Sequence, residues 1–450
     1  MKSRPNPAES GSDEMFQRLI AGMCGAFFGL SLLKFGNPVV MDKFVEWPGN
    51  PYAWVLNPWP VAISYWLLAV VVAVGIFASR WKTNAPRWLL LLPLVWLAWQ
   101  CVAGTQTVDV PLTRITLKHF AGCVICFYLG LFVLARLKRP FSFWLGLFCA
   151  FVAILAAGFE QHFGGLAEAR RYFFAYLYSE PKAIPPELLK KFSSDRIFST
   201  LFYPNTLAGA LLLLLAPMLA IVCRMRLTIP AKWFLSLLVG LAALACLYWS
   251  GSKGGWLLML LLGLAALFRL PFGGRQKLLI AGVILVAGLA GFFLKHAAFF
   301  QRGATSVSAR VDYWQAALEI TAAHPVLGTG PGTFSIAYEK VKKPEWEMAR
   351  LTHNDYLQQA SDSGAIGFAA YSLFIFGALG WIYSRGKLKE DWLRFCVWLG
   401  LLGLSLQSFF EFGLYVPALA WPAFALTGWL LGSAGNQIDN PAVVRYSCGK

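Results

Sequence analysis

The chain has 450 residues, of which 58% are hydrophobic and only 14% are charged, and its mean hydropathy is +0.58. Because a soluble domain carries about 25% charged residues, this composition excludes an ordinary soluble enzyme, a coiled coil and a disordered chain. The formal net charge is +17. In so apolar a chain we attribute this charge to membrane topology and to an anionic partner, rather than to nucleic acid.

About twelve stretches are candidates for transmembrane helices, each of which needs about 20 mostly apolar residues. They cover residues 17–35, 60–79, 87–104, 118–135, 141–159, 204–223, 233–251, 254–268, 278–294, 364–383, 394–410 and 414–431. The sequence therefore predicts an all-α, polytopic membrane protein with about twelve spans.

Lys and Arg are concentrated in every second short loop between these stretches, and such residues favour the cytoplasmic side. This alternation predicts that both termini are cytoplasmic. It also places two long segments, about 160–200 and 295–363, on the outer face. We divide the chain into a disordered tail, the first five spans, a core that contains the second outer segment, the last two spans and a second tail, which are residues 1–14, 15–195, 196–383, 384–431 and 432–450.

Two helices are expected in the second outer segment. Residues 308–323 have apolar side chains at helical spacing, Ser306 or Ser308 can cap this helix, and a His-Pro pair follows it. A second helix is predicted over 344–362, with Pro in its first turn and Gly364 after its end. The large outer segment is therefore expected to be helical.

His353 is the strongest candidate for a catalytic residue. On a helix it would share one face with Tyr356, Leu357 and Ala360, so that the apolar members could dock on the membrane domain while His353 faces a cavity. An unperturbed His titrates near 6.5, which suits a general acid or base. The alternative is a structural His held by the neighbouring Asp355.

Three basic residues near outer helix ends are candidates for binding an anion. Arg196 precedes Asn205 at the start of the sixth span, and a helix N-terminus with an Arg suits an anion. Arg310 lies four residues before Trp314 and offers a bidentate fork. Lys253 lies in a Gly-rich turn between two spans. The alternatives are an interfacial Arg, a helix-surface charge and a plain hairpin. Together with His353, these residues could hold a pyrophosphate and activate a hydroxyl.

Other motifs point away from cofactor chemistry. There is no P-loop, zinc-protease motif or nucleophile elbow in the sequence. The Gly-Thr-Gly-Pro-Gly run at 328–332 is expected to be a plain turn, because no strand precedes it. Cys123 and Cys126 lie in an apolar stretch, which is typical of packing thiols. We therefore expect no metal, no cofactor and no nucleic-acid partner.

Four motifs occur in a fixed order around the outer segments. They are Arg196 with Phe202-Tyr203-Pro204-Asn205, then Ser252-Lys253-Gly254, then Arg310-x-x-x-Trp314 with Pro325-x-x-Gly328-x-Gly330, and last His353-Asn354-x-Tyr356-Leu357 with Gly364 and Gly367. In this order the sequence resembles the O-antigen ligase and O-antigen polymerase superfamily of bacterial membrane glycosyltransferases. The resemblance covers roughly Arg196 to Tyr371.

The resemblance implies a helical fold of the C-type glycosyltransferase kind in the bacterial inner membrane, with a metal-independent active site on the periplasmic face. It implies an undecaprenyl-pyrophosphate-linked glycan as donor. Carried over by position, Arg196 and Arg310 would bind the pyrophosphate and His353 would be the catalytic base. Lys253 departs from the pattern, since relatives usually carry Arg there. Lys253 would thus be a secondary phosphate contact, and the supporting residues would be Asn205, Asn354, Tyr356 and Trp314.

The acceptor stays open at this point. A ligase would use a lipopolysaccharide core, a polymerase a growing polysaccharide chain, and a protein O-oligosaccharyltransferase a Ser or Thr. A twelve-span transporter or flippase is a different class with the same topology. Transporters more often carry ionisable residues in mid-span and repeats between their halves. Neither is evident in this sequence, so we favour the enzyme.

Overall fold

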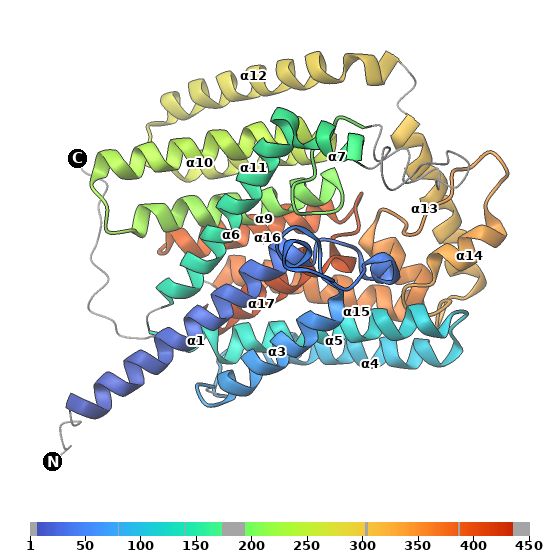
Figure 1. Cartoon of the computed structure of the whole chain (residues 1–450), viewed down its shortest axis with the longest axis horizontal. Helices are drawn as coiled ribbons and strands as arrows, with labels where there is room; N and C mark the ends of the chain where they lie inside the picture. Colours follow the sequence, from blue (N-terminus) through green and yellow to red (C-terminus); the bar gives the residue numbers. More distant parts are fainter. Residues whose placement is uncertain are drawn as a thin grey trace.

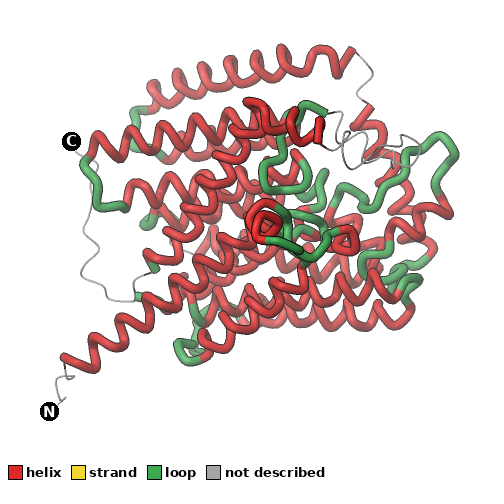
Figure 2. The backbone as a smooth tube through the Cα atoms, in the orientation of Figure 1, coloured by secondary structure: helices red, strands yellow, loops and turns green. Residues whose placement is uncertain are grey.

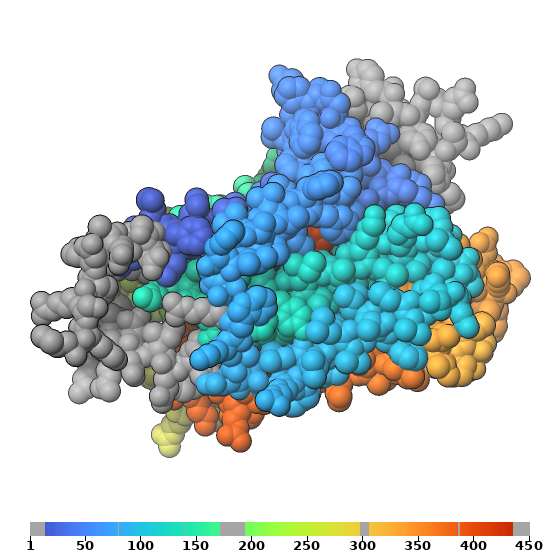
Figure 3. Space-filling view, turned by 90° about the horizontal axis from the view of Figure 1, so that it is seen from below, coloured from blue at the N-terminus to red at the C-terminus, as the bar shows by residue number. Residues whose placement is uncertain are grey.

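The computed structural model describes residues 7–79, 81–138, 140–172, 194–301, 305–385 and 388–434, and these residues form helices and loops without any strand. Figure 1 shows the long helices running side by side across a bundle, and Figure 2 shows loops at both ends of it and in the middle of the view. Seen from below in Figure 3, the surface is formed mainly by the first part of the chain, in blue to cyan. The α-helices are α1 (Pro7–Lys34), α2 (Pro51–Leu56), α3 (Val61–Ile76), α4 (Arg87–Ala103), α5 (Val110–Phe132), α6 (Phe141–Glu160), α7 (Leu166–Tyr172), α9 (Pro204–Arg224), α10 (Ile229–Ser250), α11 (Lys253–Arg269), α12 (Gly274–Gln301), α13 (Thr305–Ala323), α14 (Phe334–Val341), α15 (Asp355–Arg385), α16 (Trp392–Gln407) and α17 (Pro417–Ala434). Short 3-10 or π turns are η1 (Val39–Phe44), η2 (Gly104–Gln106), η3 (Leu134–Arg136), η4 (Gln161–Gly165) and η7 (Gly413–Tyr415).

The chain is a polytopic membrane protein. Eight helical segments of the described residues are long and apolar enough to cross a bilayer, namely those built on α1, α4, α5, α6, α9, α10, α12 and α15. Two shorter apolar helices, α3 and α16, accompany them. Each apolar stretch singled out in the sequence falls on a helix. The all-α architecture is therefore confirmed, while the number of twelve spans stays a prediction.

The centre of the bundle depends on small residues, as is usual where helices meet in a membrane. α5 packs along α17, and a Cβ atom at Gly130 of α5 would overlap the backbone of Ala425. α1 packs in the same way along α6, where Gly25 meets Gly146. These glycines let the backbones touch, so α5 packs closely on α17 and α1 packs closely on α6.

α12 lies at the outer edge of the bundle, beyond α10 and α11, as Figure 1 shows. It packs mainly on α11, where Trp256 donates a hydrogen bond from its indole N–H to the carbonyl oxygen of Gly288 at 3.0 Å. Its other faces expose apolar side chains such as Leu279, Val283 and Val286. In a membrane such faces contact lipid tails.

The prediction of a helix over 344–362 is wrong in its first half. The chain forms a loop from Lys342 to Asn354, and α15 begins at Asp355. The side-chain oxygen of Asn354 accepts hydrogen bonds from the backbone N–H groups of Tyr356 (3.0 Å) and Leu357 (3.1 Å), which is the bonding of a helix N-cap. Asn354 therefore marks the start of α15, and the residues before it form a loop and not the predicted helix.

One predicted helix cap is also wrong. α13 begins at Thr305, so Ser306 and Ser308 lie inside it, although it ends at Ala323 as predicted. α9 begins at Pro204 as predicted, and no side chain caps it. α1 begins inside the segment expected to be a tail. Residues 1–6, 173–193 and 435–450, which include parts of both expected tails and of the first outer segment, lie outside the described residues.

α15 is kinked at Gly364, which ends its first part as the sequence predicts. Gly364 has φ 70° and ψ −175°, a conformation that is essentially restricted to glycine. The turn at 325–332 packs into this kink through hydrogen bonds from Ala365 N–H to Pro325 O (2.8 Å) and from Gly330 N–H to Asp362 O (2.9 Å). A Cβ atom at Gly364 would overlap Val326 O. The turn at 325–332, which contains the predicted plain turn, thus fixes the position of α15, which begins two residues after His353.

Candidate active site

A buried carboxylate, Glu411, joins several of the residues singled out in the sequence. It lies in the loop 408–416 between α16 and α17, and its side chain is 9% exposed. Its Oε1 atom accepts hydrogen bonds from Arg310 Nη2 and from Asn205 Nδ2, the latter at 2.5 Å. Its Oε2 atom lies 3.3 Å from His353 Nδ1. One side chain therefore contacts the candidate base and a candidate phosphate ligand.

Arg310 approaches this carboxylate from α13. Besides its ion pair with Glu411, it donates from Nε to the carbonyl oxygen of Phe410 at 3.1 Å and from Nη1 to that of Ser306 at 3.2 Å. Its side chain is 19% exposed. The guanidinium thus connects α13 to the loop 408–416 and keeps one side open to solvent.

Arg196 reaches the same carboxylate through one intermediate residue. Its Nε donates to Ser250 O at 2.6 Å, and its Nη2 donates to Asn205 Oδ1 at 2.8 Å. Asn205 in turn donates to Glu411, so its amide lies between the two charged groups. Asn205 is the second residue of α9, so the start of this helix holds the amide between Arg196 and Glu411.

Two lysines add positive charge. Lys253 is the first residue of α11, and its positive charge interacts with the charges of Arg196 and Arg310. Lys295, near the end of α12, was not identified from the sequence. Its Nζ lies 3.5 Å from the ring centre of Tyr248, and its charge interacts with that of Arg196. Arg196, Arg310, Lys253 and Lys295 gather four positive charges around the carboxylate of Glu411, and such a cluster suits an anion of multiple charge.

His353 is not on a helix, which corrects the prediction of a shared helical face. It directly precedes α15 with φ 51°, and its ring is packed between those of Tyr313 (centres 5.9 Å apart) and Phe412 (4.7 Å). Trp314 donates its indole N–H to the carbonyl oxygen of His353 at 3.4 Å. A non-glycine residue in this left-handed conformation is held there by its surroundings, and such residues cluster at functional sites.

The bond to Glu411 determines which nitrogen of the His353 imidazole carries the proton. An ionised carboxylate can only accept hydrogen bonds, so Nδ1 carries a proton when it bonds to Glu411 and Nε2 keeps a free lone pair. The side chain is 29% exposed, which lets a substrate approach. In this arrangement His353 can take a proton at Nε2.

Glu411 stays ionised in these surroundings. Burial alone would raise the pKa of its carboxyl group, but the charge of Arg310 and the hydrogen bond from His353 together hold that pKa below its usual value. A permanent negative charge beside Nδ1 stabilises the imidazolium that forms when Nε2 takes a proton.

Two of the predicted supporting residues, Asn354 and Tyr356, make contacts that hold α15 in place. Asn354 makes the N-cap bonds of α15, and Tyr356 is buried, with its hydroxyl donating to the carbonyl oxygen of Ser405 at 2.9 Å. Both hold the helix that follows His353. Neither contacts Glu411 in the hydrogen bonds that the structure gives for them.

Sequence reasoning missed Glu411, although a signal was present. It is the only charged residue between Arg394 and the end of α17, within an otherwise apolar stretch. An ionisable residue in such a stretch is expensive to bury and therefore indicates a function. The predicted spans 394–410 and 414–431 already placed Glu411 in the connection between them, but no motif linked this residue to His353 or to the arginines.

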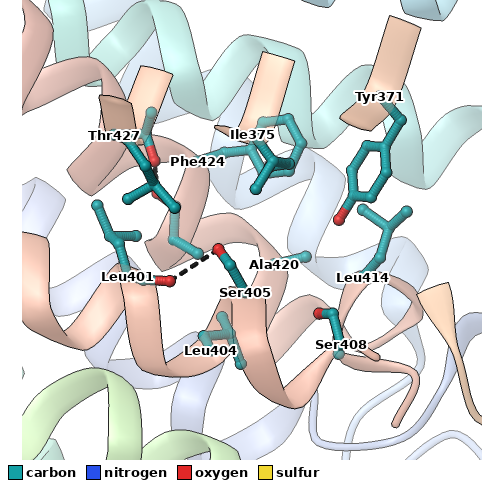
Figure 4. Close-up of a pocket in the computed structure, with 13 residues that line it drawn as sticks. Tyr371, Ile375, Leu401, Leu404, Ser405, Ser408, Leu414, Ala420, Phe424 and Thr427 are labelled. Atoms are coloured by element: carbon teal, nitrogen blue, oxygen red, sulfur yellow. Dashed lines mark hydrogen bonds between the residues drawn. The ribbon is translucent and has the colours of Figure 1, made fainter. Parts of the chain in front are cut away.

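A pocket lies beside the loop that carries Glu411. Figure 4 shows it between α15, α16 and α17, lined by Tyr371, Ser405, Ser408 and mostly apolar side chains. Ser405 bonds back to Leu401 O at 2.8 Å within its own helix. The residues that line this pocket do not include His353 or the arginines, so it is separate from the cluster at Glu411.

The described residues contain no group of three or more His, Cys, Asp or Glu side chains that could hold a metal ion. Residues 238–372 match the family model whose description is O-antigen ligase. The matched segment contains Lys253, Arg310 and His353, and it leaves out Arg196 and Glu411. A search of curated proteins found no match to the chain.

Proposed function

Because the O-antigen ligase domain at residues 238–372 supports membership of the O-antigen ligase and polymerase superfamily, we propose that the chain transfers a glycan from undecaprenyl pyrophosphate to an acceptor hydroxyl. The reaction would take place at the periplasmic face of the bacterial inner membrane, with both termini in the cytoplasm. The observation that supports this proposal is the sharing of Glu411 by His353 and Arg310, with Arg196 attached through Asn205.

The pyrophosphate of the donor would lie among Arg196, Arg310 and Lys253. Negative charge builds up on the leaving oxygen as its bond to the sugar breaks, and fixed positive groups lower the energy of that state. The two arginines can each present two N–H donors, whereas Lys253 acts as a point charge. The polyprenyl tail would lie against the apolar helices of the bundle.

The acceptor would be activated by His353. Its hydroxyl oxygen attacks the anomeric carbon, the bond from that carbon to the pyrophosphate oxygen breaks, and the electron pair leaves with the pyrophosphate. The hydroxyl proton moves to Nε2 of His353, and the resulting imidazolium is stabilised by Glu411. A positioned base contributes about 10²–10⁴ in rate. A single displacement of this kind inverts the anomeric configuration.

The proposal is tested by complementation of a bacterial strain that lacks its surface-glycan ligase or polymerase. We expect His353→Ala, Arg196→Ala and Arg310→Ala to abolish or strongly reduce glycan transfer at normal membrane levels. Matched controls are His324→Ala and Arg226→Ala, because both side chains are exposed and lie outside the cluster. Full activity of all three site variants would contradict the proposed active site.

The same experiment identifies the acceptor. If the wild-type chain restores glycan-capped lipopolysaccharide, the acceptor is a lipid core. If the strain without the chain makes products with a single repeat and the wild-type chain restores long ones, the chain is a polymerase. Glycosylated periplasmic protein would point to a Ser or Thr acceptor.

A further inference from the structure

A second pocket lies at the junction of η1, the start of α5 and α14. Its volume is about 310 Å³, which is in the range of small-molecule sites. Its walls combine apolar side chains, including Leu112, Ile115 and Ile336, with the polar groups of Ser335 and Asp109. A mixture of apolar surface and hydroxyl-binding groups suits a sugar ring, which has apolar C–H faces and a polar edge.

Two cations line the same pocket. Lys43 comes from η1, and Arg350 comes from the loop that precedes α15. The Nζ of Lys43 lies 5.2 Å from the ring centre of Phe44, and the Cζ of Arg350 lies 5.1 Å from the same centre. The two charges are therefore no more than about 10.3 Å apart, so both act on an anionic group that lies in the pocket.

The only carboxylate on the pocket wall has a structural bond. Asp109 is the N-cap of α5, and its Oδ1 accepts the backbone N–H of Leu112 at 2.9 Å. Of the charged residues that line the pocket, Lys43 and Arg350 are cations and Asp109 is an acid. An anionic group beside the two cations gains charge-assisted hydrogen bonds that a neutral group of the same size lacks.

The pocket is linked by a short, anchored segment to the candidate base. Arg350 precedes His353 by three residues, and the intervening Leu351 and Thr352 are buried. The backbone N–H of Thr352 donates to the side-chain oxygen of Gln358 at 2.8 Å, which ties the segment to α15. A ligand held by Arg350 would therefore lie next to the loop that positions His353.

We propose that this pocket is a subsite for an anionic sugar of the glycan substrate, whose carboxylate or phosphate group binds between Lys43 and Arg350. The assignment of the ligand to a glycan rests on the proposed function. The sugar ring lies against the apolar wall, and Asp109 and Ser335 accept or donate hydrogen bonds to its hydroxyl groups. The subsite selects glycans that contain a negatively charged sugar.

The test measures binding rather than turnover. The full chain in nanodiscs of phosphatidylcholine is titrated with glucuronic acid, glucose 6-phosphate and glucose, with saturation-transfer NMR as the readout. Charge-assisted hydrogen bonds are strong enough that we expect at least one of the anionic sugars to bind at least about tenfold more tightly than glucose. Lys43→Gln and Arg350→Gln should each weaken that binding by about tenfold. Lys340→Gln, an exposed residue of α14 outside the pocket, should leave it unchanged.

Three outcomes would overturn the subsite. These are equal binding of glucose and both anionic sugars, unchanged binding in the Lys43→Gln variant, and displacement of the anionic sugar by phosphatidylglycerol, which would assign the cations to a lipid headgroup. Lys43→Gln is decisive if Arg350→Gln disturbs the loop, because Lys43 comes from a separate segment. His353→Ala should keep sugar binding while losing transfer, so that a failed subsite and a failed proposed function give different results.

Discussion

Glu411→Gln tests the site most directly, because it preserves the size of the side chain and removes its charge. In the wild-type chain, Oε1 accepts from Arg310 and Asn205, while Oε2 faces Nδ1 of His353. In the variant the amide oxygen can keep the first two bonds. The amide NH₂ then points at Nδ1 and donates, so the imidazole must accept there and carry its proton on Nε2. An Nε2 that already holds a proton cannot act as a base.

The size of the effect follows from two contributions. Loss of the base lowers the rate by about 10²–10⁴, which corresponds to about 2.7–5.4 kcal/mol of barrier. Removing one partner of a fully buried ion pair costs about 3–5 kcal/mol of stability. Arg310 and His353 are 19% and 29% exposed, so water offsets part of this cost. We therefore expect a loss of about 2–3 kcal/mol in unfolding free energy.

The assay uses purified protein in liposomes that contain the lipid-linked donor, with initial transfer rate and thermal unfolding measured on the same samples. The control is Glu319→Gln, since Glu319 is exposed on α13 and accepts a hydrogen bond from Gln315. It should behave as wild type in both measurements. A Glu411→Gln protein that transfers glycan within about threefold of the wild-type rate would refute the assignment of His353 as a base oriented by this carboxylate.

Three further predictions concern the same region. Because the pKa of Glu411 is lower in the folded chain than the usual 4.5, its ionised form stabilises the fold above pH 4.5, and this stabilisation is lost as the pH falls through the lowered pKa. The stability difference between wild type and Glu411→Gln should therefore persist to pH 5 and shrink only below about 4.5. Thermal unfolding measured against pH checks this, and a difference already lost at pH 6 would contradict it. Arg196→Lys should raise the KM for the donor by about tenfold, because one ammonium group cannot replace the fork that contacts Asn205; steady-state kinetics with an unchanged KM would speak against a phosphate contact. Gly364→Ala should lower the unfolding free energy by about 1–3 kcal/mol because of its backbone conformation, whereas Gly380→Ala in the open part of the same helix should not destabilise the protein.

The helices could be predicted from the sequence because apolar stretches of this length have few alternatives in a membrane. The start of α9 at Pro204 and the break at Gly364 were also readable, since Pro and Gly have narrow backbone requirements. The loop 342–354 could not be predicted, because its path depends on tertiary hydrogen bonds such as the one from the Thr352 N–H to the side-chain oxygen of Gln358. A Pro followed by two Glu residues favours a helix locally, and tertiary contacts override it.

The candidate site was predicted in part. The sequence singled out Arg196, Arg310 and His353, and the structure joins these three by hydrogen bonds that no motif spacing reveals. The sequence could not show that Glu411 connects them, because Glu411 lies 58 positions beyond His353 in an otherwise apolar stretch. Lys295 was missed for a similar reason, since its relevance arises only where the end of α12 approaches Tyr248.

The sharing of one carboxylate by the proposed base and a proposed phosphate ligand has a consequence for interpreting mutagenesis. When two groups bond to the same carboxylate, removing either one changes the bonds of the other, and their effects do not add. Under the proposed mechanism, a slow Arg310 variant therefore reports on proton transfer as well as on donor affinity. A double-mutant cycle between Arg310 and His353 is needed to separate the two contributions.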